Sequence, residues 1–567
     1  MGALHVTSHS SFAACLPAGP YNNSPNIVTC SPGAGESFDT LGGDDELTVT
    51  AGTVGTVTMG ADNDTFNLTG GTVLMVDQGT SGDIATISGG SIGTLLQGSG
   101  GDQLTINGGS ITTLLDQGSF SDTLIINGGT LAQIEQGTGQ DSLTITAGTT
   151  GAINQDDGLD FFEMGPGVVI DSLDQGADLD VAIINGGRII GLFTDGDYVE
   201  FHAGRIGDVN LRQADNTFIM DGSMGTVQID GFLSAEQGAD TFTLTSGTIG
   251  SFVNSGSGND SILIDGTVIG GAVEMEAGDD MFTWSSGNIA SFDGGVGSDS
   301  ATISASEYDG SQMLDGGDDA SSGDGFVDVL TFDGVTASAA AGAVINWETI
   351  NITNNASVTL DGVTTELVNI TTGGAGILTG LSAPVVNVCA GSATIGGASS
   401  VADVLGCVSN DTIVITDNAT VTNRLEGAGG NDIISILGNA TIPVQVRGDG
   451  PGQDGSAAFP GNDIITINTT GTVFRVVGDG GDDRIFLNNG TVTEFISGGD
   501  GDDYIEANGG SAQIIVGNDG DDVISIDGAI IDASANAPDE TSIDGNAGND
   551  RIELRSGIVS GIDGDDG

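Results

Sequence analysis

Aspartates recur along the chain in one local pattern, with apolar residues two and four positions after them. In the stretch QGSGGDQLTINGG (97–109), for example, Asp102 is followed by Leu104 and Ile106. A carboxylate beside a glycine-rich turn can coordinate a cation, act as a catalytic acid or base, or end a loop by accepting hydrogen bonds from local amides. Whether the pattern repeats decides between these roles.

The pattern repeats in two long series. The first consists of Asp45, Asp64, Asp83, Asp102, Asp122, Asp141, Asp160, Asp180, Asp197, Asn216 in the same role, Asp240, Asp260, Asp280 and Asp299. The second consists of Asp411, Asp432, Asp463, Asp483, Asp503, Asp522 and Asp550. Most steps are 19 or 20 residues, with one of 17 and one of 24 in the first series and two insertions near 30 in the second. A fixed period of this size indicates a repeat architecture.

One repeat contains the elements of one solenoid coil. Leu104 and Ile106 point to one face of a short strand, Asn107-Gly108-Gly109 turns the chain, and Ile111 and Leu114 form a second apolar segment. A single coil cannot bury its apolar row, but coils stacked about 4.8 Å apart make that row continuous. We therefore expect an all-β, right-handed parallel β-solenoid (β-helix or β-roll) with about 19–20 residues per coil.

The composition fits a solenoid and indicates bound cations. The 567 residues include 98 Gly, 9 Lys plus Arg and 79 Asp plus Glu, which gives a formal charge of -70. An apolar content of 38% is too high for a plain acidic disordered chain. The charge argues against nucleic acid and anionic membranes as partners.

A second row of polar residues lies five positions before the aspartates. It consists of Gln78, Gln97, Gln117, Gln136, Gln155 and Gln175. In stacked coils these amides fall on top of one another. We expect a structural amide ladder near the core, the alternative being an exposed recognition stripe.

The turns of the second series resemble the calcium-binding nonapeptide of RTX proteins. GGDGDDYIE (498–506) and, at the end of the first series, GGVGSDSAT (294–302) follow it most closely, with variants such as GAGGNDII (427–434) and GNAGNDRI (545–552). In that family each Asp, with carbonyls of the glycine turn, coordinates a Ca²⁺ shared with the next coil. The resemblance implies Ca²⁺ as cofactor and the ligands Asp260, Asp280, Asp299, Asp432, Asp483, Asp503, Asp522 and Asp550. Here the motif recurs about every twenty residues, so only one edge would hold ions. Over 45–299 the turns are degraded, and an Asp that only caps its turn is an equal alternative.

The first half also resembles passenger regions of bacterial autotransporters. The resemblance covers about 40–362 and is most specific at INWETINITNNASVTLDG (345–362). It implies a secreted, adhesin-type solenoid at the extracellular or bacterial cell surface, anchored by a C-terminal barrel. Its partners would be a host-cell receptor, a glycan or a second copy of the chain. No barrel-like segment follows in the sequence, so we expect a passenger fragment. The alternative is a self-assembling filament or surface-layer component.

Four cysteines fit an exported protein. Cys15 and Cys30 precede the repeats, and Cys389 and Cys407 are separated by about one coil. We expect one disulfide in an N-terminal cap and one between adjacent coils, with free thiols as the alternative.

The pattern predicts five segments. They are a cap (1–40), the first solenoid series (41–304), an acidic loop insertion (305–330), a solenoid without Asp turns (331–410) and an RTX-like solenoid (411–567). We expect the insertion to be a loop that protrudes from the solenoid, with a local calcium site as the alternative.

Catalytic chemistry has little material in this sequence. Only three histidines are present, at 5, 9 and 202, and Asp197, Glu200, His202 and Arg205 form the one mixed cluster. We therefore expect no enzyme, with a polysaccharide-active β-helix as the lesser alternative. Some ice-binding solenoids also have 19-residue repeats. Here the residue pairs before successive anchors (DN, SG, GG, FS, GQ, GL) are too irregular for a flat ice-binding face.

Overall fold

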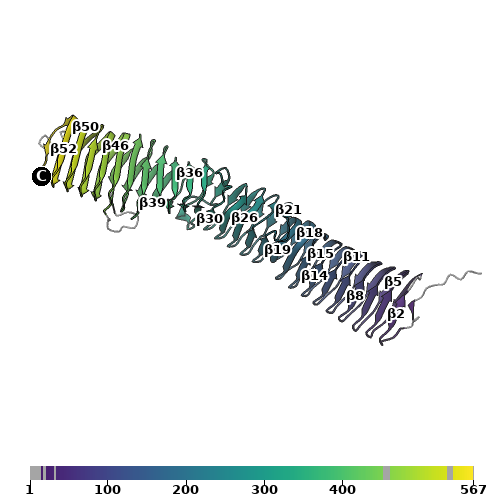
Figure 1. Ribbon diagram of the computed structural model, residues 1–567. Coiled ribbons are helices and arrows are strands. Elements are labelled where there is room, and N and C mark those ends of the chain that lie inside the picture. Colours follow the sequence, from purple (N-terminus) through teal and green to yellow (C-terminus); the bar gives the residue numbers. More distant parts are fainter. Residues whose placement is uncertain (1–14, 17–20, 31–33, 451–459, 533–540, 566–567) are drawn as a thin grey trace, which may run out of the picture. The chain divides into compact units, whose positions relative to one another are not determined.

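The computed structural model describes residues 15–16, 21–30, 34–450, 460–532 and 541–565. It confirms an all-β parallel β-solenoid of about 26 turns with about 20 residues per coil (Figure 1). The chain forms two compact units, unit 1 (Met1–Glu274) and unit 2 (Met275–Gly567). The described residues contain no helix long and apolar enough to cross a membrane.

From β4 (Glu46–Val49) to β17 (Val169–Asp174), each coil of unit 1 contributes two strands to two parallel ladders. In the coil that contains Asp102 these strands are β10 (Gln103–Ile106) and β11 (Ser110–Asp116). In the first ladder, β10 pairs in register with β8 (Ile84–Ile87) and β12 (Thr123–Ile126). In the second, β11 pairs with β9 (Ser91–Leu96) and β13 (Thr130–Glu135), with a shift in register within the strand. Isolated bridges between the turns, such as Ser99 with Ser119, add a narrow third row.

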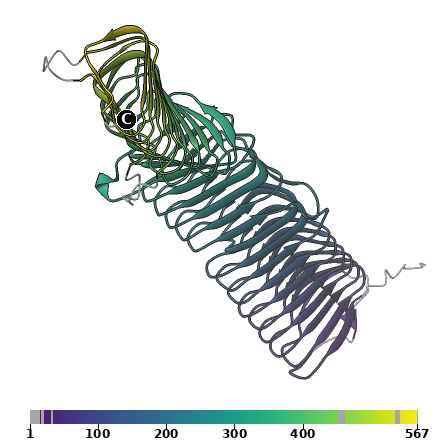
Figure 2. The ribbon, with the colours of Figure 1, turned by 60° about the vertical axis from the view of Figure 1, so that its left-hand side comes forward.

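The core of unit 1 follows from the alternation of side chains along these strands. Leu104 and Ile106 are each 1% exposed, whereas Thr105 between them is half-buried. Because the register is exact from coil to coil, Leu104 stacks between Ala85 and Leu124. The buried row runs along the stack, and each coil is stabilised by its neighbours rather than by contacts of its own. Figure 2 shows the stacked coils from another side.

Unit 2 keeps the same plan with longer strands toward its end. Strands β46 (Ile464–Gly480) and β47 (Arg484–Asp500) pair in parallel along their whole length, from Ile464 with Arg484 to Gly480 with Asp500. The pairing includes part of the glycine-rich turn. An aromatic group near its start contains Phe292 and Trp347, whose rings stack with centroids 6.2 Å apart.

The insertion is partly built into unit 2. It contains strand β31 (Met313–Asp315) and a 3-10 turn, η1 (Ser322–Asp324), and ends where β32 (Val329–Asp333) begins. Strand β31 pairs in parallel with β29 (Ser291–Asp293) and with β34 (Val344–Ile345). The residues of the insertion on both sides of β31, 305–312 and 316–328, lie outside the strands.

The cysteines confirm one expected disulfide and correct the other. Cys15 and Cys30 are bonded, on antiparallel strands β1 (Cys15–Leu16) and β2 (Ile27–Cys30). The expected bond between Cys389 and Cys407 is absent, and neither cysteine is part of a disulfide.

The reason lies in the turns that follow the two cysteines. Strand β39 (Ser382–Cys389) turns at once into β40 (Ser392–Gly396), whereas β41 (Ser400–Leu405) ends before Cys407 and a wide turn follows it. Within that turn, Cys407 Sγ lies 2.9 Å from Ser409 Oγ. Cys389 and Cys407 are about one coil apart in the sequence, but they lie at turns of different shape.

Alkylation without prior reduction should label Cys389 and Cys407, because both are partly exposed, and leave Cys15 and Cys30 unmodified. Peptide mass spectrometry reads out the four positions separately. Recovery of a Cys389–Cys407 linked peptide from the unreduced protein would contradict this assignment.

Candidate cation sites

The anchor residues, defined as the aspartates of the two series and the residues aligned with them, form a hydrogen-bonded ladder. The backbone N–H of each anchor donates to one carboxylate oxygen of the anchor in the next coil. In unit 1, Asp83 N donates to Asp102 Oδ1 at 2.6 Å and Asp102 N to Asp122 Oδ1 at 2.7 Å. In unit 2, Asp483 N donates to Asp503 Oδ1 at 2.8 Å. One oxygen of each of these carboxylates is therefore fixed by the coil that precedes it.

The second oxygen of most anchors is buried and has no hydrogen-bond partner. This holds for Oδ2 of Asp45, Asp64, Asp83, Asp102, Asp122, Asp141, Asp160, Asp180, Asp240, Asp299, Asp328, Asp432, Asp463, Asp483, Asp503, Asp522 and Asp550. A buried polar atom without a partner is costly, and a buried charge more so. Such a row requires either protons or cations along the stack.

Burial has the expected effect on proton affinity. Desolvation is the largest cause that raises the pKa of Asp83 and Asp122 to about 8, with the neighbouring anchors' charges adding to it. The same causes raise the pKa of Asp483 to about 9 and of Asp503 to about 7.

The position five residues before the anchor, here called position −5, differs between the two units. In unit 1 it holds the glutamines from Gln78 to Gln175, all 0% exposed. Each Nε2 donates to the Oε1 of the preceding glutamine, as Gln117 does to Gln97 at 3.0 Å and Gln155 to Gln136 at 2.8 Å. The predicted amide ladder is confirmed. Its complete burial excludes the alternative of an exposed recognition stripe.

In most of unit 2 the same stack position holds glycine. A Cβ atom on Gly498 would lie 2.1 Å from Asp503 Oδ2 and 2.8 Å from the carbonyl oxygen of Gly517 in the next coil. For Gly478 the corresponding distances are 2.1 Å to Asp483 Oδ2 and 2.4 Å to the Gly498 oxygen. No side chain fits there.

We call each such group of bare Cα, anchor Oδ2 and next-coil carbonyl a glycine cradle. The glycines are Gly294, Gly316, Gly406, Gly427, Gly448, Gly478, Gly498 and Gly517; Gly545 has the Oδ2 but no next-coil carbonyl within 4 Å of such a Cβ. At Gly406 the anchor oxygen is not free, because Asp411 Oδ2 accepts a hydrogen bond from Cys407 N at 3.0 Å.

The cradles of unit 2 fit a hard cation in their donor chemistry. Ca²⁺ takes six to eight oxygen ligands, and each cradle presents an unpartnered carboxylate oxygen beside a main-chain carbonyl. Among the described residues, no three acidic, histidine or cysteine side chains already surround one point in metal-ligand geometry. The oxygen ligands that the cradles themselves offer are one carboxylate oxygen and a main-chain carbonyl per coil. In the coils of unit 1 from Gln78 to Gln175, a glutamine side chain occupies position −5, so this arrangement is absent from those coils.

Six of the eight predicted ligands lie at glycine cradles or at Gly545. They are Asp299, Asp432, Asp483, Asp503, Asp522 and Asp550. Asp260 and Asp280 are buried anchors, but Ser255 and Met275 precede them at position −5, where a side chain replaces the bare Cα.

Two anchors were missed by the sequence prediction. Asp328 Oδ1 accepts from Asp299 N at 2.7 Å, and Glu348 Oε2 accepts from Asp328 N at 2.6 Å, so the ladder continues beyond Asp299. Both have apolar residues two and four positions later and could have been found by that rule. The insertion lengthens the separation between Asp299 and Asp328 beyond the usual period, and the following anchor is a glutamate rather than an aspartate.

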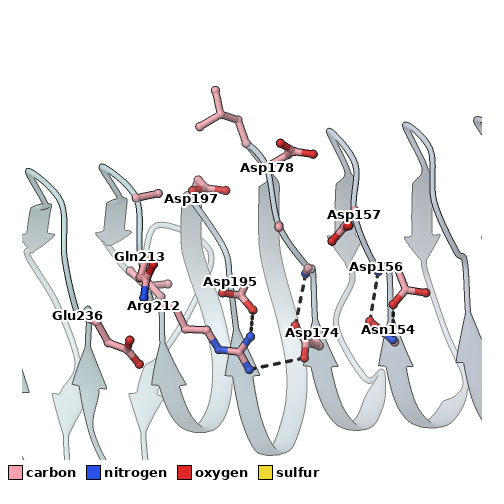
Figure 3. A pocket seen from close by; sticks show the side chains of 15 residues that line it. Asn154, Asp156, Asp157, Asp174, Asp178, Asp195, Asp197, Arg212, Gln213 and Glu236 are labelled. Carbon is pink, nitrogen blue, oxygen red and sulfur yellow. Dashed lines mark hydrogen bonds and ion pairs between the residues drawn. The ribbon is translucent and has the colours of Figure 1, made fainter.

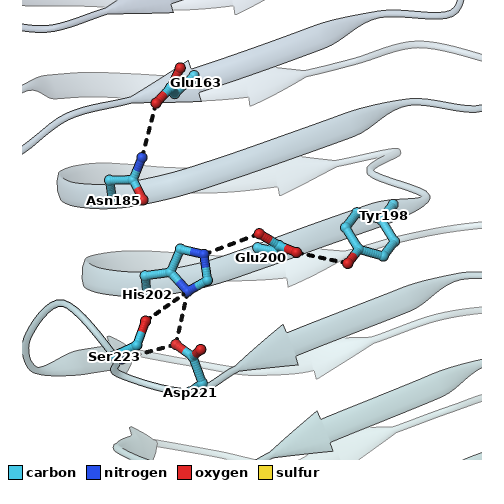
Figure 4. Close-up of polar contacts among 7 residues, drawn as sticks. All are labelled: Glu163, Asn185, Tyr198, Glu200, His202, Asp221 and Ser223. Carbon is cyan, nitrogen blue, oxygen red and sulfur yellow. Dashed lines mark hydrogen bonds and ion pairs between the residues drawn. The ribbon is translucent and has the colours of Figure 1, made fainter.

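The mixed cluster around His202 forms a polar network on the surface of unit 1 (Figure 4). His202 Nδ1 lies 2.9 Å from Asp221 Oδ1 and 3.1 Å from Ser223 Oγ, and Nε2 lies 3.1 Å from Glu200 Oε2. Burial alone would lower the pKa of His202, but Asp221 and then Glu200 raise it overall. Both ring nitrogens are thus engaged by neighbouring side chains, and the two carboxylates favour the protonated form of the imidazole.

The structure does not bring the other two members of that cluster to His202. Arg205 Nε donates to Asp230 Oδ1 at 2.5 Å. Asp197 is an anchor, and its Oδ2 accepts from Asp180 N at 2.8 Å. The four residues therefore do not form one site.

A cavity of about 690 Å³ opens among the turns of unit 1 (Figure 3). Arg212 pairs there with Asp195, and its second nitrogen lies 3.8 Å from Asp174 Oδ2. Burial raises the pKa of Asp195 to about 7, with Arg212 opposing and Asp174 adding to the shift. Asp156 and Glu236 also line the cavity, so its wall is largely acidic.

Comparisons with known proteins do not assign the chain to a family. A scan of protein-family models found no match, and a search of curated proteins found none. Among solved structures, the chain is similar to a hyperactive, Ca²⁺-dependent, β-helical antifreeze protein from an Antarctic bacterium. The identity is 20%, the match covers 59% of this chain and 88% of that chain, and the TM-score is 0.26. No property of that protein is transferred to this chain on so low a score.

In calcium-free buffer, unit 1 should lose stability as the pH rises from about 4 to about 8. The folded pKa of Asp83, Asp122 and Asp180 is raised from 3.8 to about 8, so folding binds protons that the unfolded chain has released in this window. Hydrogen exchange of peptides from 80–190 should become faster between pH 5 and pH 8, after correction for the intrinsic rate. Unchanged protection across this range would contradict the prediction.

Proposed function

We propose that this protein is an extracellular structural β-solenoid whose second unit is stabilised by Ca²⁺ in its glycine cradles. The observation that carries the proposal is the row of buried, unpartnered Oδ2 atoms, each facing a bare glycine Cα and, in all but the last coil, a carbonyl of the next coil. Asp299, Asp432, Asp483, Asp503 and Asp522 would hold the ions. Asp550 would join them through its Oδ2 against Gly545.

Bound Ca²⁺ would supply positive charge and oxygen coordination between successive coils. The residues of the chain do the rest. The anchor N–H fixes one oxygen of each carboxylate, the glycine leaves room beside the other, and the next coil's carbonyl completes the contact. Two coils are thereby joined at each turn, in addition to their strand hydrogen bonds. A solenoid whose stability is a sum of such interfaces becomes stiffer with each one.

The overall charge supports an environment rich in calcium. The chain carries a formal charge of -70, with 9 arginines and no lysine. Calcium sites in extracellular modules work at about 10⁻⁴–10⁻³ M Ca²⁺, a range suited to ligand sets with few carboxylates. The cradles, with one carboxylate per coil and neutral carbonyls, belong to this class.

We further infer an adhesive or surface-passenger role, with a receptor, a glycan or a second copy of the chain as partner. The support is the sequence resemblance to autotransporter passengers and the acidic cavity at Arg212 on unit 1, which offers charged and polar groups to a ligand.

Calcium removal should loosen unit 2 and leave unit 1 nearly unchanged. Hydrogen exchange at pH 7.5 of the full chain with EGTA, compared with about 2 mM Ca²⁺, should show faster exchange in peptides from 427–550. Peptides from 45–260 serve as the internal control. Equal protection of 427–550 in both buffers would sink the calcium proposal.

The variant Gly498→Ala sharpens the same experiment. Its Cβ would displace the Asp503 carboxylate, so peptides around 478–522 should lose protection in Ca²⁺. Gly42→Ala is the matched control, because its Cβ meets only the Ala61 oxygen at 3.7 Å. Equal effects of the two substitutions would mean that the cradle has no special role.

Electron microscopy in Ca²⁺, together with binding to cells and glycans, tests the adhesive role. Single particles that bind cells or glycans are expected, because the acidic cavity at Arg212, which offers polar and charged groups to a ligand, lies on unit 1. Particles that join end to end, without binding to cells or glycans, would favour the filament alternative and contradict adhesion.

A further inference from the structure

The loop between β31 and β32, residues 316–328 and here called the insertion loop, is attached to the solenoid of unit 2. Ser322 donates from its backbone N to Glu366 Oε1 at 3.1 Å and from Oγ to Glu366 Oε2 at 2.7 Å. Val327 N donates to Ser298 Oγ at 3.1 Å. The loop is therefore held at its middle and at its end, and does not simply protrude.

Three carboxylates beside this loop have a buried oxygen without a partner. Asp328 and Glu348 are anchors with 0% and 2% exposure, and each has one oxygen bound by a backbone N–H of the ladder. Their other oxygens, Asp328 Oδ2 and Glu348 Oε1, accept no hydrogen bond, and neither does the buried Oδ2 of Asp318 on the loop. Asp318 lies close enough to repel the charges of both anchors.

The chain supplies no positive charge to this group. Residues 213–423 contain no lysine, arginine or histidine. Buried carboxylates normally pair with a cation or accept several hydrogen bonds, because the loss of hydration is otherwise uncompensated. The missing partner must therefore come from solution.

We propose that the insertion loop binds a divalent cation, Ca²⁺ by its preference for hard oxygen ligands, between Asp318 and the anchors Asp328 and Glu348. The site shares Asp328 with the glycine cradle at Gly316, and it differs from the other cradles because it unites carboxylates from a loop and from two successive coils. The three carboxylates do not surround one point in the structure, so the Asp318 side chain must turn toward the two fixed anchors. Asn346, which donates to Asp315 Oδ1 at 2.8 Å and to the Gly317 carbonyl at 3.3 Å, holds the start of the loop in place for this.

Tryptophan-sensitised Tb³⁺ luminescence tests the site directly. Trp347 precedes Glu348, is fully buried, and donates from Nε1 to the carbonyl of Leu314 at 3.0 Å, next to the start of the loop. The chain has only two tryptophans, Trp284 and Trp347. Tb³⁺ bound at Asp318 should therefore emit on tryptophan excitation, and Ca²⁺ should displace it.

Asp318→Asn and Glu348→Gln should each weaken this Tb³⁺ binding by about tenfold or more, because each removes a charged oxygen ligand. Asp319→Asn is the matched control, with the same charge change on the exposed neighbour. Asp503→Asn is the second control. Because the coils of 427–550 contain no tryptophan, this substitution should leave the tryptophan-excited emission unchanged. Circular dichroism verifies that each variant is folded. The two test variants change different parts of the site, Asp318 on the loop and Glu348 in a coil.

Absence of tryptophan-excited emission from the wild type would overturn the proposal. So would wild-type affinity in both Asp318→Asn and Glu348→Gln, or an equal loss in Asp319→Asn. The test is separate from that of the cradles in 427–550. If the calcium proposal for 427–550 fails, protection of those peptides is unaffected by EGTA while the tryptophan-excited signal remains, and the reverse holds if this site fails.

Discussion

A row of buried carboxylates, repeated once per coil, is the constraint on which the rest of this structure depends. Strand stacking places successive anchors one coil apart, and the ladder of N–H donors satisfies only one oxygen of each. The other oxygens are buried at the spacing of a β-sheet, where like charges repel strongly. The fold is stable only if this charge is neutralised along the whole stack.

The two units meet this constraint in different ways. In unit 1 the glutamines at position −5, from Gln78 to Gln175, build a neutral amide ladder beside the aspartates. Burial raises the pKa of anchors such as Asp83, so these carboxyl groups keep their protons to a higher pH. In unit 2 glycine at the same place removes the side chain and brings a carbonyl of the next coil to the carboxylate. Burial raises the pKa of the anchors in both units, as at Asp83 and Asp483, so the difference lies in position −5, which is glutamine from Gln78 to Gln175 and glycine at the cradles of unit 2.

Much of this could be predicted from the sequence because the repeat is local and regular. The anchors, the period, the parallel solenoid and the amide ladder all follow from spacing alone, as Asp102 and Gln117 illustrate. Prediction failed where an insertion broke the period, so that Asp328 and Glu348 were missed. It also failed at Cys389 and Cys407, which are separated by about one coil but lie at turns of different shape. The contrast between glutamine and glycine was visible in the sequence, but its meaning required the positions of Oδ2 and the carbonyls.

The central claim is that cations neutralise the aspartate row in unit 2 and not in unit 1. An anomalous difference map from a crystal grown with Ca²⁺ tests it most directly, because it locates each ion beside its own anchor. We expect peaks beside Asp432, Asp483, Asp503 and Asp522 and none along the glutamine-flanked anchors from Asp83 to Asp180. Peaks along both rows, or an empty row in unit 2, would contradict the account.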